Sequence, residues 1–150
     1  MTYKRILVPV DGSAPSRLGL REAVRLAKGQ RASLQLVHVV DEHYVLMAAG
    51  EVGVQLDGVI ADLKKGARRL VQGLEASVRK QGVPCSSVLL ETLTGPAADP
   101  IVKQARKWRA DLIVIGTHGR RGMRRMLLGS DAEQIVRTSP VPVLLVRAKR

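Results

Sequence analysis

A glycine-rich stretch in the last third of the chain holds the residues best suited to chemistry. Gly116 and Gly119 are followed, after nine further residues, by Gly129 and Ser130. Glycines let the backbone come close to a phosphate group and adopt positive φ angles. The hydroxyl of Ser130 can either cap a helix or donate to a phosphate oxygen. The spacing therefore predicts a phosphate-binding loop, and a glycine-capped connection without a binding function is the alternative.

Basic side chains crowd the same loop, which contains Arg120, Arg121, Arg124 and Arg125. They add positive charge that suits phosphate, although a solvated basic surface is the alternative interpretation. His118 is either a phosphate contact or an exposed loop histidine. The loop lacks the G-x-x-x-x-G-K-[ST] pattern of a Walker A motif, so it does not predict P-loop chemistry.

The glycine loop begins where a predicted strand ends and finishes where a predicted helix starts. Ligands of open α/β sheets bind beyond the carboxyl ends of the strands. The N-terminus of a helix attracts anions. Asp11 ends the first predicted strand and is expected to face the loop across the sheet. Its carboxylate is either a ligand group or a cap for the helix that follows.

Five short apolar segments alternate with segments of helical spacing. The predicted strands cover residues 6–10, 33–40, 87–92, 111–116 and 141–146. The predicted helices run from Ser13 to a stop at Gly29, over 57–81, from about Asp99 through Trp108, and over 130–137. Residues 41–56 have no clear period and predict a mobile loop with a short helical turn at most. This alternation predicts one α/β domain over 1–150, with a parallel sheet and helices on both faces.

The net charge of +12 favours anionic partners, namely nucleotides, nucleic acid or acidic membranes. Specific recognition of single strands normally adds grouped aromatic side chains. Aromatic residues are only 2% of this chain, and Trp108, Tyr3 and Tyr44 are not grouped. Specific nucleic-acid binding is therefore not expected, whereas purely electrostatic binding stays an alternative.

Several other functions lack support in the sequence. The lone cysteine, Cys85, cannot form an internal disulfide and is expected to be buried and inert. The histidines have no zinc-like spacing, and there is no G-x-S-x-G elbow. His38, on a predicted strand, is expected to be a hydrogen-bonded core residue. No run approaches the ~20 apolar residues that cross a bilayer, and no signal-peptide pattern is seen, so the expected location is the cytoplasm, without membrane insertion.

The chain resembles the universal stress protein family over essentially its whole length. The similar segments are ILVPVDGS, LQLVHVV, DLIVIGTHGRRG, LLGSDAEQIVR and SPVPVLLVR. The glycine loop matches the G-x2-G-x9-G-[ST] pattern of that family's ATP-binding branch. The resemblance implies a Rossmann-like fold with an open five-stranded parallel sheet of strand order 3-2-1-4-5.

The same resemblance implies an adenine nucleotide over the ends of the first and fourth strands. Asp11 would contact the ribose or adenine side, the backbone near Val39 would contact adenine, and the phosphates would lie on the loop. Mg²⁺ would be an additional partner if the nucleotide is ATP. The residues expected to form the site are Pro9, Val10, Asp11, Val39, Gly116, Thr117, His118, Gly119, Arg120, Gly122, Gly129, Ser130 and Asp131.

One position departs from the family pattern. A small or apolar residue usually follows the Gly-Ser pair, whereas this chain has Asp131. An acid in the first turn suits the helix dipole, but it repels a nearby phosphate unless it points away or helps to hold a metal ion. AMP or ADP is therefore a rival to ATP as the ligand.

The sequence thus predicts a stress-response regulatory protein that binds ATP or AMP. It predicts no catalytic residue, and at most a slow ATPase. The resemblance also implies a homodimer formed through the last strand, Val141 to Val146. The alternative functions are a slow Mg-dependent ATPase and an electrostatic binder of nucleic acid or acidic surfaces.

Overall fold

The computed structural model describes residues 2–50, 56–117 and 128–147. The predictions made for His118, Gly119, Arg120 and Gly122 lie outside the described residues.

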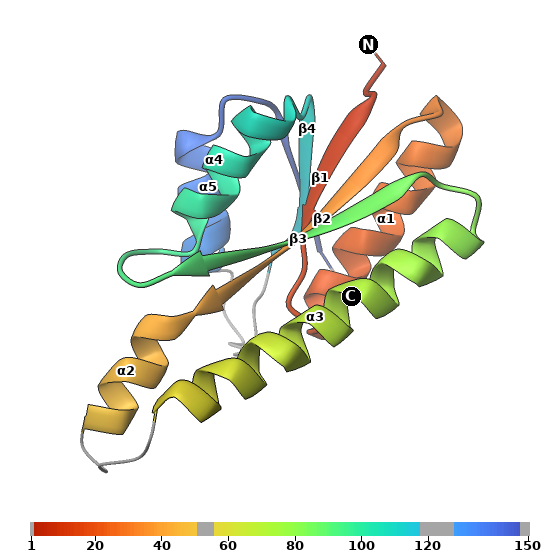
Figure 1. Ribbon diagram of the computed structural model, residues 1–150. Coiled ribbons are helices and arrows are strands. Elements are labelled where there is room, and N and C mark those ends of the chain that lie inside the picture. The colour runs from red at the N-terminus through yellow and green to blue at the C-terminus, as the bar shows by residue number, and fades with distance from the viewer. Residues whose placement is uncertain (1, 51–55, 118–127, 148–150) are drawn as a thin grey trace.

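A five-stranded, fully parallel sheet forms the centre of the molecule (Figure 1). Its spatial order is β3-β2-β1-β4-β5, so the predicted order 3-2-1-4-5 is confirmed. The strands are β1 (Arg5–Pro9), β2 (Ser33–Asp41), β3 (Cys85–Thr92), β4 (Leu112–Gly116) and β5 (Val143–Val146). The helices are α1 (Ala14–Gln30), α2 (Glu42–Gly50), α3 (Leu56–Lys80), α4 (Ala98–Trp108) and α5 (Ser130–Thr138).

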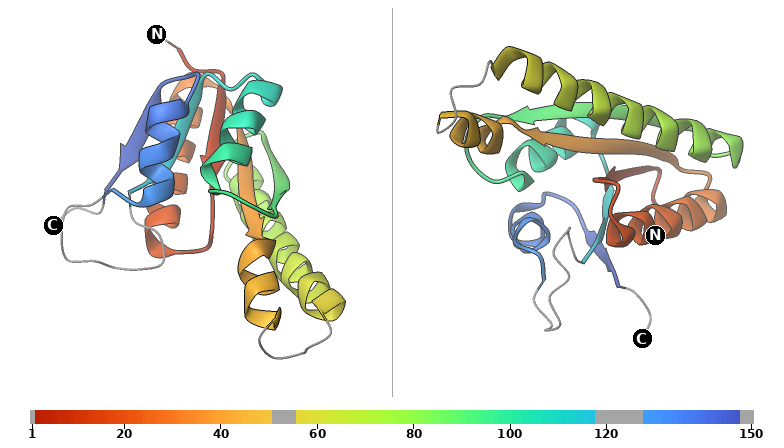
Figure 2. Two further views of the ribbon diagram at one scale, coloured as in Figure 1. Left: turned by 90° about the vertical axis from the view of Figure 1, so that its left-hand side faces the viewer. Right: turned by 90° about the horizontal axis from the view of Figure 1, so that it is seen from below.

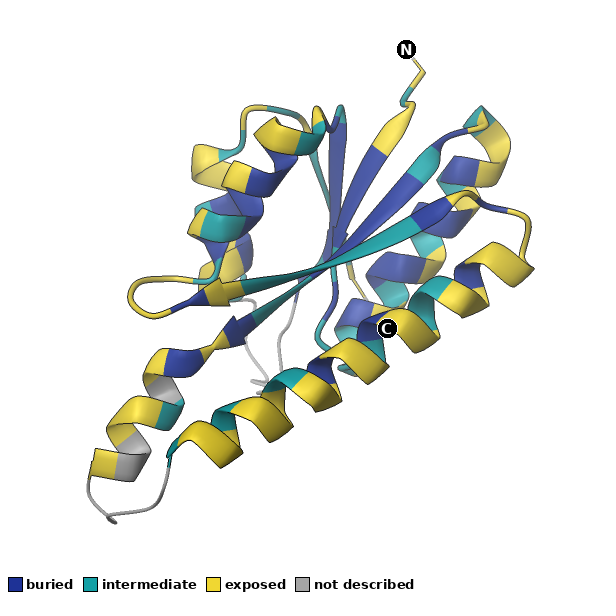
Figure 3. Ribbon diagram, viewed as in Figure 1, coloured by how far each residue is buried: buried dark blue, intermediate teal, exposed yellow. Residues whose placement is uncertain are grey.

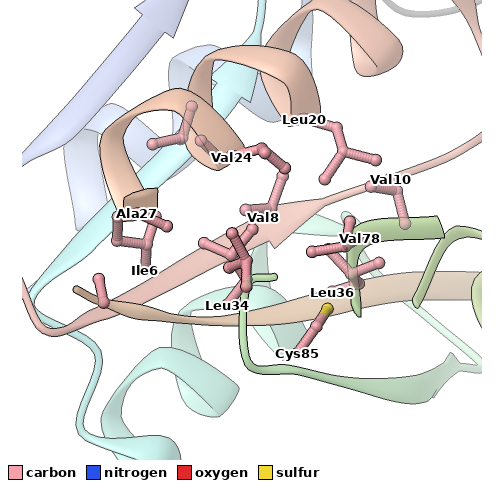
Figure 4. Close-up of a cluster of buried hydrophobic side chains, with 14 of the residues drawn as sticks. Ile6, Val8, Val10, Leu20, Val24, Ala27, Leu34, Leu36, Val78 and Cys85 are labelled. Carbon is pink, nitrogen blue, oxygen red and sulfur yellow. The ribbon is translucent and has the colours of Figure 1, made fainter. Parts of the chain in front are cut away.

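Two apolar cores lie on opposite faces of the sheet, because successive residues of a strand point to opposite sides. Ile6 and Val8 of β1 face α1 and α3, as Figure 4 shows for this cluster. Leu7, between them in sequence, faces α4 and α5 on the other side. Helices therefore cover both faces, as Figure 2 shows from two further directions, and the predicted α/β architecture is confirmed.

The strands at the centre of the sheet separate toward their carboxyl ends. β1 pairs with β2 over its full length, and the Val10 N–H continues this ladder by donating to the Val37 carbonyl at 2.8 Å. By contrast, β1 pairs with β4 only at Ile6 and Leu7. Beyond Leu7, β1 therefore has no ladder partner in β4.

The segment 42–50 corrects the sequence analysis, which predicted a mobile loop for 41–56. Asp41 is the last residue of β2, and α2 follows from Glu42. The helix was missed because it is apolar without a single apolar stripe, so its sequence carries no helical period. It extends beyond the sheet beside the first turns of α3, and Leu46 and Met47 are exposed (Figure 3).

An ion-pair cluster fixes the start of α2. The Lys64 ammonium of α3 lies 2.7 Å from a Glu42 carboxylate oxygen and 3.1 Å from one of Glu91. These two acids raise the pKa of Lys64, chiefly by hydrogen bonding to its charged form. One lysine thus joins the beginning of α2, the first half of α3 and the end of β3.

Several element boundaries also differ from the predictions by one or two residues, and two of these differences have a clear structural cause. α1 does not stop at Gly29 but continues to Gln30, where Arg31 takes a left-handed conformation (φ 53°) and donates its N–H to the Ala27 carbonyl. β5 begins at Val143 rather than Val141. Proline cannot donate to a ladder, so Pro142 contributes only its carbonyl, which accepts from the Ile113 N–H at 3.0 Å.

Close backbone contact joins α1 to the end of β4. A Cβ atom on Gly116 would overlap the Pro15 carbonyl, and one on Gly19 would lie 2.9 Å from the Gly116 nitrogen. Both positions therefore require glycine, because no side chain fits between α1 and β4.

We expect Gly19→Ala to lower the free energy of unfolding by about 1–3 kcal/mol, since the added methyl group forces α1 away from β4. Gly29→Ala is the matched control on the same helix, because nothing lies within 4 Å of its Cβ position. It should be neutral or stabilising by about 0.5–1 kcal/mol. Urea unfolding measures both, and equal effects would contradict the packing described here.

The Cys85 thiol is buried, as the sequence predicted. Burial, and secondarily the charge of Glu75, raises the pKa of Cys85 from 9.0 to about 12. At pH 8 the folded protein therefore carries a neutral thiol, and only the thiolate is a strong nucleophile. We expect a thiol reagent at pH 8 to label the native protein at least a hundredfold more slowly than the urea-unfolded chain. Similar labelling rates in the two states would refute the inert, buried thiol.

Candidate functional site

A cavity of about 640 Å³ lies at the carboxyl ends of the strands, where β1 and β4 separate. This volume is within the range of small-molecule sites. Its walls come from the ends of β1, β2 and β4 and from the first turns of α4 and α5. The position agrees with the rule that ligands of open α/β sheets bind beyond the carboxyl ends of strands.

The cavity brings together every predicted site residue that the structure describes. They are Pro9, Val10, Asp11, Val39, Gly116, Thr117, Gly129, Ser130 and Asp131. Further lining residues were not predicted from the sequence: Ser13, Ser16, Val37, His38, Asp41, Ala97, Ile101, Ile115, Leu128 and Ala132. Asp41 had a usable signal, because it ends the second strand as Asp11 follows the first. Ala97 and Ile101 had none, since their place depends on how α4 packs.

Polar groups of the turn itself fix Asp11. One oxygen of the Asp11 carboxylate accepts from the Ser13 N–H at 2.9 Å, and the Asp11 N–H donates to Ser16 Oγ at 3.1 Å. The N-cap of α1 is Ser13, whose hydroxyl accepts from the Ser16 N–H at 3.3 Å. Asp11 is therefore not the helix cap, and its half-buried carboxylate is held at the cavity wall.

His38 joins the end of β2 to the end of β1. Its Nδ1 lies 2.7 Å from the Val10 carbonyl oxygen. A carbonyl can only accept, so Nδ1 carries the proton, and Nε2 of the neutral ring is left as an acceptor. The sequence predicts that His38 is a hydrogen-bonded core residue. The hydrogen bond is present, but the ring is only half-buried and lines the cavity.

The start of α5 forms another wall. Its N-cap is Gly129, which has no side chain to bond the amides of the first turn. Ser130 is the first helical residue, so its possible role as the cap is ruled out. The Gly129 N–H donates to the Thr117 carbonyl at 3.1 Å. This bond holds together the two ends of the glycine loop, whose residues 118–127 lie outside the described chain.

Three acidic residues, Asp11, Asp41 and Asp131, line the cavity from three different segments of the chain. Desolvation, followed by repulsion from Asp41 and Asp11, raises the pKa of Asp131, although the residue as a whole is exposed. Among the described lining residues there is no lysine or arginine. The described walls are thus acidic in a protein whose net charge is strongly positive.

In the described parts of the chain, no group of three or more His, Cys, Asp or Glu side chains is arranged to hold a metal ion. In the same residues, no helix is both long and apolar enough to cross a bilayer.

The fold and the cavity define a doubly wound α/β protein with a ligand-sized site at its topological switch point. Residues 2–147 match the sequence model of the universal stress protein family. A universal stress protein of Methanocaldococcus jannaschii is 34% identical over 149 residues, which cover 97% of this chain and 82% of that protein. The chain therefore belongs to the universal stress protein family, and the predicted resemblance is confirmed.

Two solved structures are also similar. Hypothetical protein MJ0577 has a TM-score of 0.85 and 25% identity, over 100% of this chain and 99% of that chain. A universal stress protein from Archaeoglobus fulgidus, solved in complex with dAMP, has a TM-score of 0.65 and 25% identity. That comparison covers 97% of this chain and 98% of the other.

Proposed function

We propose that this protein is a nucleotide-responsive regulator of the stress response that binds ATP or AMP in the cavity between β1 and β4. One observation carries the proposal: the predicted strand ends and both ends of the glycine loop line the same cavity. The dAMP complex of the Archaeoglobus fulgidus relative supports an adenine nucleotide as the ligand.

The chemistry of the walls suggests how the nucleotide lies. Val39, Ile101 and Ile115 offer apolar surface suited to the faces of an adenine ring. Asp11 and Asp41 offer carboxylates, which accept hydrogen bonds from the hydroxyl groups of a ribose. The uncapped first turn of α5 offers N–H groups and a positive dipole end to a phosphate. Four residues of the loop belong to the same proposed site by sequence alone: His118, Gly119, Arg120 and Gly122.

The proposal assigns binding rather than catalysis to this site. Nucleotide binding would act by changing the shape or the partners of the protein in the cytoplasm, and no side chain is given a catalytic role. Mg²⁺ enters only as a companion of ATP, if ATP is the ligand.

The test is to denature the purified protein and identify the small molecules released. We expect about one adenine nucleotide per chain, or, if the protein purifies empty, a rise in melting temperature on adding AMP or ATP. Ala97→Trp should abolish binding, because Ala97 lines the cavity and an indole would fill it. Ala76→Trp, at an exposed position of α3, is the matched control and should bind normally.

Two outcomes would refute the proposal. One is a wild-type protein that is empty and whose melting temperature does not respond to added nucleotide. The other is a folded Ala97→Trp variant that binds nucleotide as well as the Ala76→Trp control does, since the ligand would then lie elsewhere.

The proposal includes a homodimer formed through Val141 to Val146. β5 is an edge strand of the described sheet, pairing there with β4 alone. An edge strand presents unpaired backbone groups that another chain can cover, and the side chains of β5 are only half-buried.

Light scattering should therefore give a mass of twice 16.3 kDa at micromolar concentration. Val143→Asp should reduce it to that of one chain, because it places a charge in the proposed interface. Val136→Asp, at a position on α5 that is 45% exposed, should stay dimeric. Thermal unfolding checks that both variants are folded. A monomeric wild type, or a folded dimeric Val143→Asp variant, would contradict this interface.

A further inference from the structure

We propose that Asp131 sets how many phosphates the site accepts, so that without a divalent cation a nucleoside monophosphate binds in preference to the triphosphate. This inference rests on the proposed nucleotide site. It assigns to one side chain the choice between AMP and ATP, which the proposed function leaves open.

The placement of Asp131 is the first support. It is the second residue of α5, directly after Ser130, and it lines the same cavity as Gly129 and Ser130. The amides and dipole of this helix start are the groups expected to receive a phosphate. An acid in the same turn therefore lies beside the phosphate position, at an exposed rim rather than in the interior.

The convergence of three acids is the second support. Asp11 follows β1, Asp41 ends β2 and Asp131 begins α5, yet all three line one cavity. They act on one another across it, since Asp41 and Asp11 both contribute to the raised pKa of Asp131. A polyphosphate brings several negative charges into the field of these carboxylates, whereas a monophosphate brings far fewer.

A ribose can use two of these acids, but not the third. The hydroxyl groups of the sugar can donate to Asp11 and Asp41 on the strand side of the cavity. Asp131, on the helix side, is left next to the phosphates with no donor from the ligand. It therefore penalises each added phosphate, which is discrimination by a repulsive element.

The test compares wild type, Asp131→Asn and Glu133→Gln for AMP and ATP binding by calorimetry in EDTA. Asparagine keeps the shape of the side chain and removes its charge. Glu133→Gln removes a charge from the same turn at an exposed residue that does not line the cavity. The loop arginines are present in all three proteins, so the differences between them report the single charge. Thermal unfolding checks that each variant is folded.

We expect wild type to bind AMP at least about tenfold more tightly than ATP. Asp131→Asn should bring this ratio to within about threefold, mainly by a gain in ATP affinity, and Glu133→Gln should keep the wild-type ratio. The inference is wrong if wild type binds ATP as tightly as AMP, or if Asp131→Asn leaves the ratio unchanged or weakens ATP binding. Failure of the proposed function looks different: no adenine nucleotide would then bind to any of the three proteins.

Discussion

The limited pairing between β1 and β4 is the constraint on which the rest of the structure depends. β1 stays with β2 through Pro9 and on to Val10, while β4 continues alongside β5 to Gly116. The two central strands share a register only at Ile6 and Leu7. Because they part beyond these residues, their carboxyl ends enclose a cavity instead of a continuous ladder.

The helices that follow these strands lie on opposite faces, which keeps the cavity open. α1 leaves β1 toward one core, and α5 follows β4 on the side of the other. The backbones of α1 and β4 come into close contact at Gly19, Gly116 and Pro15. This contact fixes α1 against the end of β4. The turn at Asp11 and the bond from Gly129 to Thr117 then hold the two rims in place. The position and shape of the site thus depend mainly on the course of the backbone.

The features that depend on the local sequence pattern, namely the strands and the glycine loop, could be predicted from the sequence. The strands were visible because buried parallel strands are apolar and β-branched, and the glycine loop because its flanks place it at the strand ends. α2 was missed because its apolar residues form no stripe. The sequence predicts a helix end at Gly29, whereas Arg31 adopts the left-handed conformation that ends α1. Such choices depend on tertiary packing, which a local pattern does not contain.

The site residues divide in the same way. Asp11, Gly129 and Ser130 were predictable because each adjoins the end of a strand or the start of a helix. The sequence predicts a core position for His38 because the surrounding strand is apolar, and this pattern does not reveal that the neighbouring strand β1 ends at Pro9. Ala97 and Ile101 lie far from the loop in sequence and reach the cavity only through the packing of α4. A correctly predicted strand order therefore does not identify every residue that lines the cavity.

The contrast between overall and local charge follows from distance. The net charge of +12 comes from 25 basic residues, many on exposed faces such as Lys65, Arg68 and Arg69 of α3. Such a field acts over about one Debye length and raises the local concentration of any anion. This field has no fixed geometry relative to the ligand, so it does not select between one phosphate group and three. In the proposed site, the acidic residues that line the cavity lie close to the bound nucleotide, where a single charge acts at short range. In the proposed function, the basic surface therefore favours the encounter with nucleotides, and the acidic wall decides which of them remains bound.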